Sequence, residues 1–284
     1  MKSLDVLIAI AVPVVWGIGL VVAKPVVADF PAIFLMALRF TVAALALVWF
    51  VPFPKAQLGT LFYVALVGAT MQYGFTFNGL RYLDAGTTAL IVQAEVPFLV
   101  LLAAVALKEK LDFKKVLGMV IAFFGIYLIS DQPQLHGKGS AIAMVMTGGF
   151  LWAMGQIIVR KYLRLGGLTL TAWLAVLAAP QLFITSLLFE SNHINVLRAA
   201  DTNTWLTVLY LGVIMTAVGY GCWYHVLGRY PASRVGSFLL LTPVTSVLGG
   251  ALFLGEQLTT LTLLGGSVII LGVAILVVEK SSEA

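Results

Sequence analysis

Residues 93–98 read Gln93-Ala94-Glu95-Val96-Pro97-Phe98, a polar, proline-broken patch inside an otherwise apolar segment. Beyond it, Lys108-Glu109-Lys110-Leu111 precedes a glycine-spaced apolar run. The region that holds these features, residues 63–128, has a counterpart about half of the chain further on. This repetition carries most of the information about the fold.

The repeat is recognised by residue types that recur in the same order. Most of the matches share an offset of 147 residues, with slips of one or two near the prolines. The matched pairs are Tyr63 with Tyr210, Tyr73-Gly74 with Tyr220-Gly221, Pro97 with Pro243, Glu109-x-Leu111 with Glu256-x-Leu258, Leu117-Gly118 with Leu264-Gly265, and Gly125 with Gly272. A repeated block with a broken apolar segment in each copy is typical of a transporter built from two halves.

The composition places the chain in a membrane. Hydrophobic residues make up 61% of the 284 residues, charged residues 10%, and the mean hydropathy is +1.04. Soluble domains contain about 45–50% apolar and about 25% charged residues. A water-soluble core of this length could not hide so much apolar surface, so the lipid bilayer must be the solvent.

The net charge of +5 does not indicate a nucleic-acid partner, because the basic residues lie between apolar runs and form no patch on one face. Cys222 is the only cysteine, which excludes an intrachain disulfide and a cysteine-based metal site. The first apolar run, Leu4 to Val27, is too long for the core of a signal peptide and is predicted to be a span. No cofactor or metal is predicted.

Ten apolar runs are long enough to cross a bilayer as helices, at about 20 residues each. They cover residues 4–27, 32–51, 58–79, 86–107, 113–129, 140–162, 168–189, 204–226, 232–253 and 260–278. The longest connection, Glu190 to Asn203, is polar and is predicted to be a surface loop.

The basic residues predict the topology. With the N-terminus in the cytoplasm, the inner segments carry 12 of the 17 basic residues, so both termini are predicted to be cytoplasmic. Because each half has an odd number of helices, the two copies must be inserted in opposite directions. Trp16-x-x-Gly19 also matches Trp152-x-x-Gly155, at an offset of 136. The expected fold is therefore an all-α membrane protein with an inverted repeat of five plus five helices, residues 1–135 and 136–284.

These residues together resemble a known family. The motifs are Trp16-Gly17, Leu38-Arg39-Phe40, the mid-helix prolines Pro97 and Pro243, and Gly255-Glu256-Gln257-Leu258. They are similar to those of the EamA-type transporters of the drug/metabolite transporter superfamily, and the resemblance covers the whole chain. One departure is Lys108-Glu109, where the family prefers Gly-Glu.

Within the family, the chain is most similar to bacterial inner-membrane exporters of aromatic amino acids. The resemblance implies a multi-pass protein of the bacterial inner membrane that exports amino acids or other small metabolites by alternating access. It also implies a basket of helices one, three, four, six, eight and nine around a central cavity, with helices five and ten peripheral.

Glu95 is the sharpest functional candidate, since it lies about 14 Å into its helix, close to the midplane. A carboxyl group at that depth is costly, and the functional interpretation is a partner for a proton or for the substrate ammonium. The alternatives are a carboxylate tied to a neighbouring helix, or a helix boundary that a turn places elsewhere. Pro97 and Pro243 each remove a backbone donor near mid-helix. We interpret both as hinges, with static kinks as the alternative.

Other polar and aromatic residues are candidates for the wall of the cavity. The alternative for each is packing between helices or against lipid. The tryptophans suit an aromatic or apolar substrate, and the remaining groups offer hydrogen bonds to a zwitterion. The candidates are Trp16, Gln72, Tyr73, Asn78, Tyr82, Gln93, Trp152, Gln156, Tyr220, Tyr224 and His225.

A further set is interpreted as architectural. Lys24 is expected to extend to the membrane surface, and Arg39 to fix packing in helix two. Glu109 and Glu256 are expected to accept hydrogen bonds from the amides of the next helix. The pairs Gly118/Gly125 and Gly265/Gly272 are each seven residues apart, so each pair lies on one face and permits close helix approach.

The predicted function is a secondary transporter that exports amino acids, with export of drugs or other metabolites as the alternative. The expected partners are a small-molecule substrate and lipid, in a monomer or a weak dimer through the peripheral helices. A membrane-embedded enzyme is disfavoured because His136, His193 and His225 are scattered. A passive channel is disfavoured by the paired hinges, and no phosphate-binding loop indicates ATP hydrolysis.

Overall fold

The computed structural model describes residues 1–230 and 235–277. Within these residues ten helical segments are long and apolar enough to span a membrane, and no strand occurs. The spans are Ser3–Asp29, Ala32–Phe50, Lys55–Tyr82, Ala85–Ala106, Phe113–Ser130, Gly139–Tyr162, Gly167–Phe189, Thr202–Leu227, Ser237–Leu254 and Thr260–Val277. The predicted number of spans is confirmed. Residues 232–234 of the predicted ninth span and residue 278 of the tenth lie outside the described residues.

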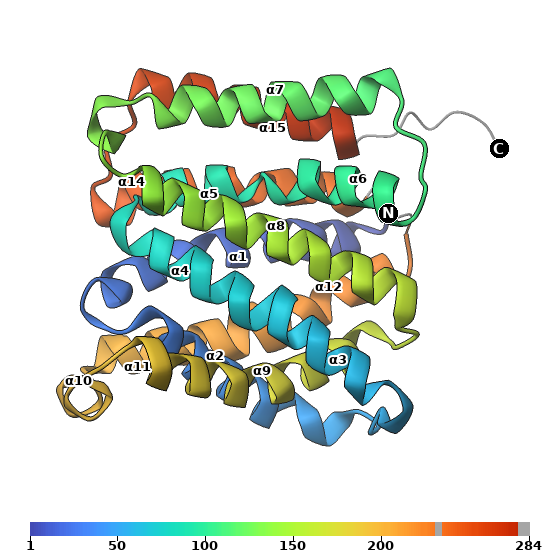
Figure 1. The fold of residues 1–284 in the computed structure, drawn as a ribbon, viewed down its shortest axis with the longest axis vertical. Coiled ribbons are helices and arrows are strands. Elements are labelled where there is room, and N and C mark those ends of the chain that lie inside the picture. The colour runs from blue at the N-terminus through green and yellow to red at the C-terminus, as the bar shows by residue number, and fades with distance from the viewer. Residues whose placement is uncertain (231–234, 278–284) are drawn as a thin grey trace.

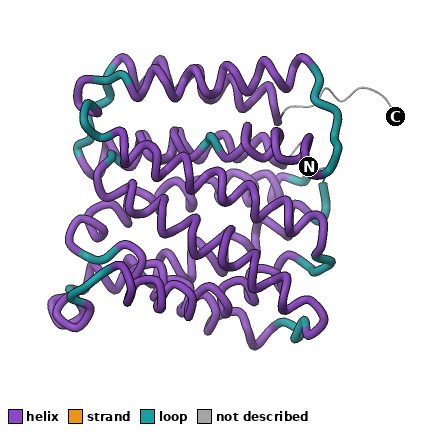
Figure 2. Tube along the Cα trace, in the orientation of Figure 1, coloured by secondary structure: helices purple, strands orange, loops and turns teal. Residues whose placement is uncertain are grey.

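The helices run side by side and the loops gather at the two ends of the bundle (Figure 2). The N-terminus lies at one end, and the short helix α10 lies at the other (Figure 1). The principal helices are α1 (Ser3–Asp29), α2 (Ala32–Leu47), α3 (Leu58–Ala65), α4 (Gln72–Tyr82), α5 (Ala85–Val92), α6 (Glu95–Ala106), α7 (Phe113–Ser130), α8 (Gly139–Tyr162), α9 (Gly167–Phe189), α10 (His193–Ala199), α11 (Thr202–Leu209), α12 (Gly219–Leu227), α14 (Leu241–Leu254) and α15 (Thr260–Val277).

Helices α7 and α15, the fifth and tenth spans, pair along one edge of the molecule (Figure 1). Glycines form their contact. A Cβ atom on Gly118 would lie 3.0 Å from the carbonyl oxygen of Gly272, and one on Gly125 would lie 2.8 Å from that of Gly265. The backbones therefore touch at positions where any side chain would separate them. The prediction that each glycine pair permits close helix approach is confirmed, and both helices are peripheral as the family resemblance implied. That the two glycine pairs meet each other was not predicted.

The fourth span is broken in the middle. Helix α5 ends at Val92, α6 begins at Glu95, and the amides of Gln93 and Ala94 bond three residues back instead of four. Pro97 has no N–H to offer the carbonyl of Gln93, which instead accepts from Val96 at 3.1 Å. The proline and the turn before it therefore end one helix and start another.

The ninth span has a related break. A 3-10 turn, Ser237–Leu240, leads into α14, and Pro243 is the third residue of that helix, as Pro97 is of α6. The third and eighth spans share a second irregularity, because each contains a π-helical segment, Leu66–Met71 and Tyr210–Val218. Such segments widen the helix by one residue per turn and often occur at functional sites.

The predicted surface loop Glu190–Asn203 contains the helix α10 and does more than connect. The carboxylate of Glu190 accepts hydrogen bonds from the amides of Ile33 and Phe34, at 2.9 and 3.0 Å. These amides start α2 and have no partner within their own helix. A surface loop was therefore an incomplete prediction, since this segment caps the second span.

Lys24 also differs from its prediction. Its ammonium group donates hydrogen bonds to the carbonyl oxygens of Leu80 and Arg81, both at 3.0 Å. These carbonyls end α4, where a positive charge is favoured by the helix dipole. Lys24 joins the first span to the third and does not simply extend to the membrane surface.

Candidate functional site

A cavity of about 70 Å³ lies inside the bundle. Its wall combines aromatic rings, a few hydrogen-bonding groups and one charge. The lining residues are Arg39, Phe40, Gly68, Ala69, Tyr73, Trp152, Gln156, Val159, Leu170, Thr171, Leu174, Thr216, Tyr220 and Tyr224. The cavity also lies beside both π segments, because Gly68 and Ala69 belong to one and Thr216 to the other.

Five of the predicted cavity residues meet in this wall, although the two halves of the chain supply them. Tyr73 comes from α4, and Trp152 and Gln156 lie one turn apart on α8. Tyr220 and Tyr224 lie one turn apart on α12 with their rings stacked, 6.1 Å between centroids. The helical spacing explains both pairs, because residues four apart share a face.

The helices around the cavity are not the set that the family resemblance implied. Residues of α2 and α9 line it, and among the described residues the first, fourth and ninth spans contribute none. Trp16 of α1 shows how a residue of the first span is kept out of the wall. The centroid of its ring lies 4.9 Å from that of Tyr220. Its indole N–H donates to the carbonyl oxygen of Met215, at 3.1 Å. Trp16 therefore supports a wall residue from outside the cavity.

Arg39 is the charged residue among the lining residues that the sequence interpretation did not place here. It is completely buried, and its Nε donates to the hydroxyl of Thr216, at 3.1 Å. Its guanidinium carbon lies 4.5 Å from the ring centroid of Tyr73 and 5.3 Å from that of Phe40. An arginine well inside a span with no acidic residue on its own helix was the available signal, because such charges usually mark a site.

Three predicted candidates lie away from the cavity. Gln72 is buried and donates to the hydroxyl of Thr76, while its Oε1 atom has no partner. Asn78 donates to the carbonyl oxygen of Gly74 in its own helix, at 2.8 Å. Tyr82 is 57% exposed at the end of α4. Local hydrogen bonds of this kind occupy short polar side chains without any role for a ligand.

The broken fourth span lies against α8 and not in the cavity wall. Gln93 is buried, and Glu95 is half-buried at the first turn of α6. The backbone of Glu95 packs on Gly149, where an added Cβ atom would lie 3.2 Å from the Glu95 amide nitrogen. Pro97 and Pro243 are both buried and lie outside the wall of this cavity.

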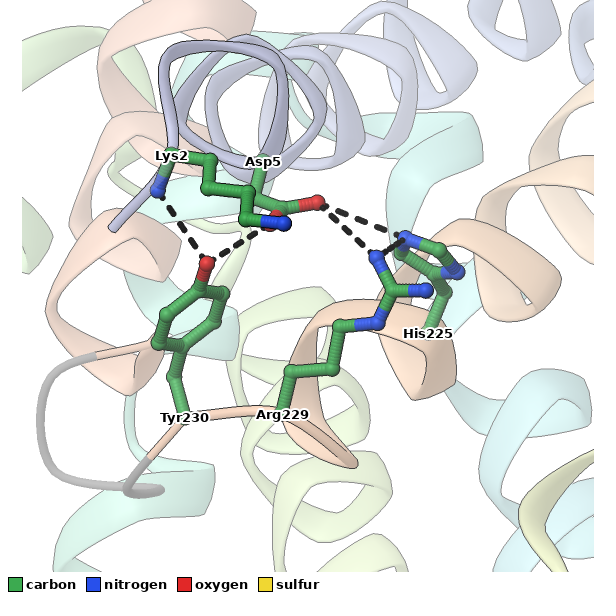
Figure 3. Close-up of polar contacts among 5 residues, drawn as sticks. All are labelled: Lys2, Asp5, His225, Arg229 and Tyr230. Carbon is green, nitrogen blue, oxygen red and sulfur yellow. Dashed lines mark hydrogen bonds and ion pairs between the residues drawn. The ribbon is translucent and has the colours of Figure 1, made fainter.

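His225 belongs to a polar cluster at the end of the bundle that holds the N-terminus (Figure 3). The buried carboxylate of Asp5 accepts from the hydroxyl of Tyr230 at 2.6 Å, and lies 3.4 Å from His225 and 3.5 Å from Arg229. The backbone N–H of Lys2 donates to the same tyrosine hydroxyl, at 3.1 Å. His225 therefore connects α12 to the start of α1 through Asp5. It does not line the cavity, whereas its neighbour Tyr224 does.

The two glutamates that match in the repeat make different contacts. Glu256 accepts hydrogen bonds from the amides of Ala85 and Gly86, at 2.5 and 3.0 Å. These amides start α5, so the prediction that Glu256 caps the next helix was wrong. Burial raises the pKa of Glu256, and the two amides oppose that shift. Glu109 instead forms an exposed ion pair with Arg160, at 2.5 Å.

Comparisons with known proteins agree with this architecture. The model of the EamA-like transporter family matches residues 3–131 and 139–278. The chain belongs to the EamA-like transporter family. A solved crystal structure with a TM-score of 0.68 covers 100% of both chains, and its 17% identity makes it evidence for the fold alone.

Curated relatives place the chain among membrane transporters. It is 33% identical to the "Probable amino-acid metabolite efflux pump" of Escherichia coli, over 97% of this chain and 95% of that protein. The protein of the same name from Salmonella typhimurium is also 33% identical, with the same coverage. An "Uncharacterized transporter" of Archaeoglobus fulgidus is 29% identical over 93% of this chain and 95% of its own. This EamA-family chain is thus a multi-pass membrane transporter and not an enzyme.

Proposed function

We propose that this EamA-family protein is a secondary transporter that exports amino acids, preferentially aromatic and other apolar ones. The observation that carries the proposal is the cavity wall, in which one guanidinium, Gln156 and two threonines accompany the rings of five aromatic residues. Polar groups of this kind suit the charged end of an amino acid, and the rings suit an apolar side chain. The name of the Escherichia coli relative supports the same substrate class.

Transport by alternating access would require this cavity to change size. Its volume of about 70 Å³ is well below the roughly 300–1,000 Å³ of sites that hold small molecules. The surrounding helices must therefore separate before a substrate can bind. Pro97 and Pro243, each beside a break in its span, are the proposed hinges, and the two π segments are further points where the helices can adjust.

The proposed topology is two inverted halves, residues 1–135 and 136–284, with both termini in the cytoplasm of a bacterium and the spans in its inner membrane. The paired breaks and paired π segments support a duplicated scaffold. The two separate stretches that match the family model support a boundary between them. A monomer, or a weak dimer through the peripheral helices α7 and α15, completes the proposal.

Glu95 is the proposed coupling residue. It is a half-buried carboxyl group inside a span, beside Gly149 of α8, and a proton moving against the substrate could neutralise it. Flux of labelled substrate into proteoliposomes should rise with an imposed pH gradient in the wild type and ignore that gradient in Glu95→Gln. Equal wild-type flux with and without the gradient would indicate facilitated diffusion.

The export function is tested in cells that carry the gene or an empty vector. Radiolabelled phenylalanine, tryptophan, leucine and aspartate are loaded, and their appearance in the medium is followed. We expect faster release of the aromatic and aliphatic substrates and no change for aspartate. Unchanged release of all four, with faster release of cationic dyes, would instead support the alternative of a drug exporter.

A further inference from the structure

Arg39 is a buried charge without a charged partner. It has no exposed surface, and no aspartate or glutamate in residues 1–230 and 235–277 lies within ion-pair distance of it. Its hydrogen-bond partners are all neutral: the hydroxyls of Thr216 and Tyr73 and the sulfur of Met36, at 3.1, 3.4 and 3.8 Å. These contacts use three of its five N–H groups. A cation inside a span is costly, so an arginine kept in this state needs a further reason.

The position of Arg39 supplies that reason. It is the one charged residue among the described residues that line the cavity, and it lies about 10 Å into its span from Ala32. We propose that Arg39 binds the carboxylate of an amino acid in this cavity, an inference that rests on the proposed function of the transporter. The substrate would supply the anion that the protein itself does not provide.

The chemistry of the wall favours a monocarboxylate with an apolar body. A guanidinium presents two parallel N–H groups that match the two oxygens of a carboxylate. A phosphate carries more charge than this single cation would balance, and within residues 1–230 and 235–277 no lysine or second arginine joins Arg39 in the wall. The ammonium end of an amino acid has acceptors in the Gln156 amide and the Thr171 hydroxyl, and aromatic faces for a cation–π contact.

Tyr73 controls access to the guanidinium in the present conformation. Its ring lies against the guanidinium of Arg39, and its hydroxyl accepts a hydrogen bond from it. Tyr73 follows the π segment Leu66–Met71 by two residues, so a change in that segment would carry the ring away from Arg39. Substrate binding then replaces a neutral contact with a charge-assisted one.

The first measurement varies the ligand and leaves the protein unchanged. Purified wild-type protein is titrated with phenylalanine, with phenylalaninol, which lacks the carboxylate, and with 3-phenylpropionate, which lacks the ammonium group. We expect phenylalanine to bind about 10- to 100-fold more tightly than phenylalaninol, as hydrogen bonds to a charged group predict. Equal affinities for these two ligands would overturn the role of Arg39.

The second measurement varies the protein. Arg39→Gln should lose the discrimination against phenylalaninol, while Arg39→Lys should keep part of it, because an ammonium group offers charge without the planar fork. Arg198→Gln, which removes an exposed arginine, is the matched control and should behave as wild type. Should Arg39→Gln not fold, the lysine variant and the ligand series on wild type still decide the question.

The two proposals fail differently. Wild-type protein that binds 3-phenylpropionate but no amino acid, with this binding abolished by Arg39→Gln and partly kept by Arg39→Lys, contradicts amino acid export and retains the carboxylate site. The opposite outcome is export of phenylalanine by the wild type together with an unchanged affinity for phenylalanine in a folded Arg39→Gln variant. That outcome supports amino acid export and contradicts the carboxylate site at Arg39.

Discussion

Glu256 caps a helix that lies 170 residues earlier in the chain, and its removal should destabilise the whole bundle. Its two carboxylate oxygens accept from the first two amides of α5, Ala85 and Gly86. An added Cβ on Gly250 would also collide with this carboxylate, so the group is tightly enclosed. Substitution Glu256→Ala leaves both amides without an acceptor, and Glu256→Gln leaves one of them facing an NH₂ group.

The size of the effect follows from these contacts. An unsatisfied buried donor costs about 1–3 kcal/mol, and Glu256 is half-buried, so water limits the loss. We expect about 2–4 kcal/mol for Glu256→Ala and about half of that for Glu256→Gln. At about 2–4 °C per kcal/mol for a chain near this size, Glu256→Ala should lower the Tm by about 4–16 °C.

The assay is thermal unfolding of purified protein in detergent, and the repeat provides a control. Glu109 matches Glu256 in sequence but forms an exposed ion pair with Arg160, worth about 0–1 kcal/mol. Glu109→Gln should therefore shift the Tm by no more than about 3 °C. Equal shifts for Glu109→Gln and Glu256→Gln would refute this assignment of the cap.

The pH dependence of the Tm provides a second test of the role of Glu256. Because the pKa of Glu256 is raised in the folded protein, the folded state holds this proton more tightly than the unfolded chain. Its contribution to stability is therefore largest below the ordinary value, 4.5, and falls as pH rises through the raised pKa. The difference in Tm between wild type and Glu256→Gln should be larger at pH 5 than at pH 7.5. A difference that grows with pH would contradict the sign.

Three other substitutions test separate parts of the structure. Gly125→Ala forces a Cβ to within 2.8 Å of a carbonyl oxygen of α15 and should cost about 1–3 kcal/mol by thermal unfolding, whereas Gly59→Ala, with open space around it, should be neutral or slightly stabilising. Asp5→Asn, which removes a negative charge from the cluster with Arg229, should lower the Tm in the same assay, and an unchanged Tm would contradict that role. Trp152→Ala should raise the KM for aromatic substrates about 2- to 10-fold relative to aliphatic ones in competition export, and a uniform change would argue against ring contact.

The architecture was predictable from sequence because it depends on properties that are local. Span length and apolar composition fixed the ten helices, and proline chemistry placed a break near Pro97 and near Pro243. The seven-residue spacing of glycines on α7 and α15 identified two faces that allow close approach. Each of these inferences needs only the residue types and a helical repeat, and none needs knowledge of a distant neighbour.

The candidate site was predictable only for residues of the same helix, because their spacing tells which of them share a face. Tyr220 and Tyr224 are four residues apart and do face one cavity, as the spacing implies. His225 follows Tyr224 directly, and successive helical residues differ in direction by about 100°, so the two could not share that face. Helical spacing could not identify the partner of Glu256, because Ala85 is 171 residues away in the sequence and belongs to another helix.

Arg39 shows what duplication leaves undetermined. At the offset of 136 that relates Trp16 to Trp152, Arg39 corresponds to Ala175, a buried residue of α9. The aromatic part of the wall is shared, since Tyr73 and Tyr220 are equivalent in the repeat. Among the described lining residues, however, the one charge comes from the first half. In the proposed inverted repeat with alternating access, one cation would hold a substrate carboxylate at one wall, and hence in one orientation, whichever side of the membrane the cavity opens to. The double substitution Arg39→Ala with Ala175→Arg moves the charge to the equivalent position in the second half. It should abolish binding of phenylalanine and should not produce binding in the opposite orientation. The reason is that α9 offers neither the Thr216 hydroxyl nor the Tyr73 ring that hold the native guanidinium.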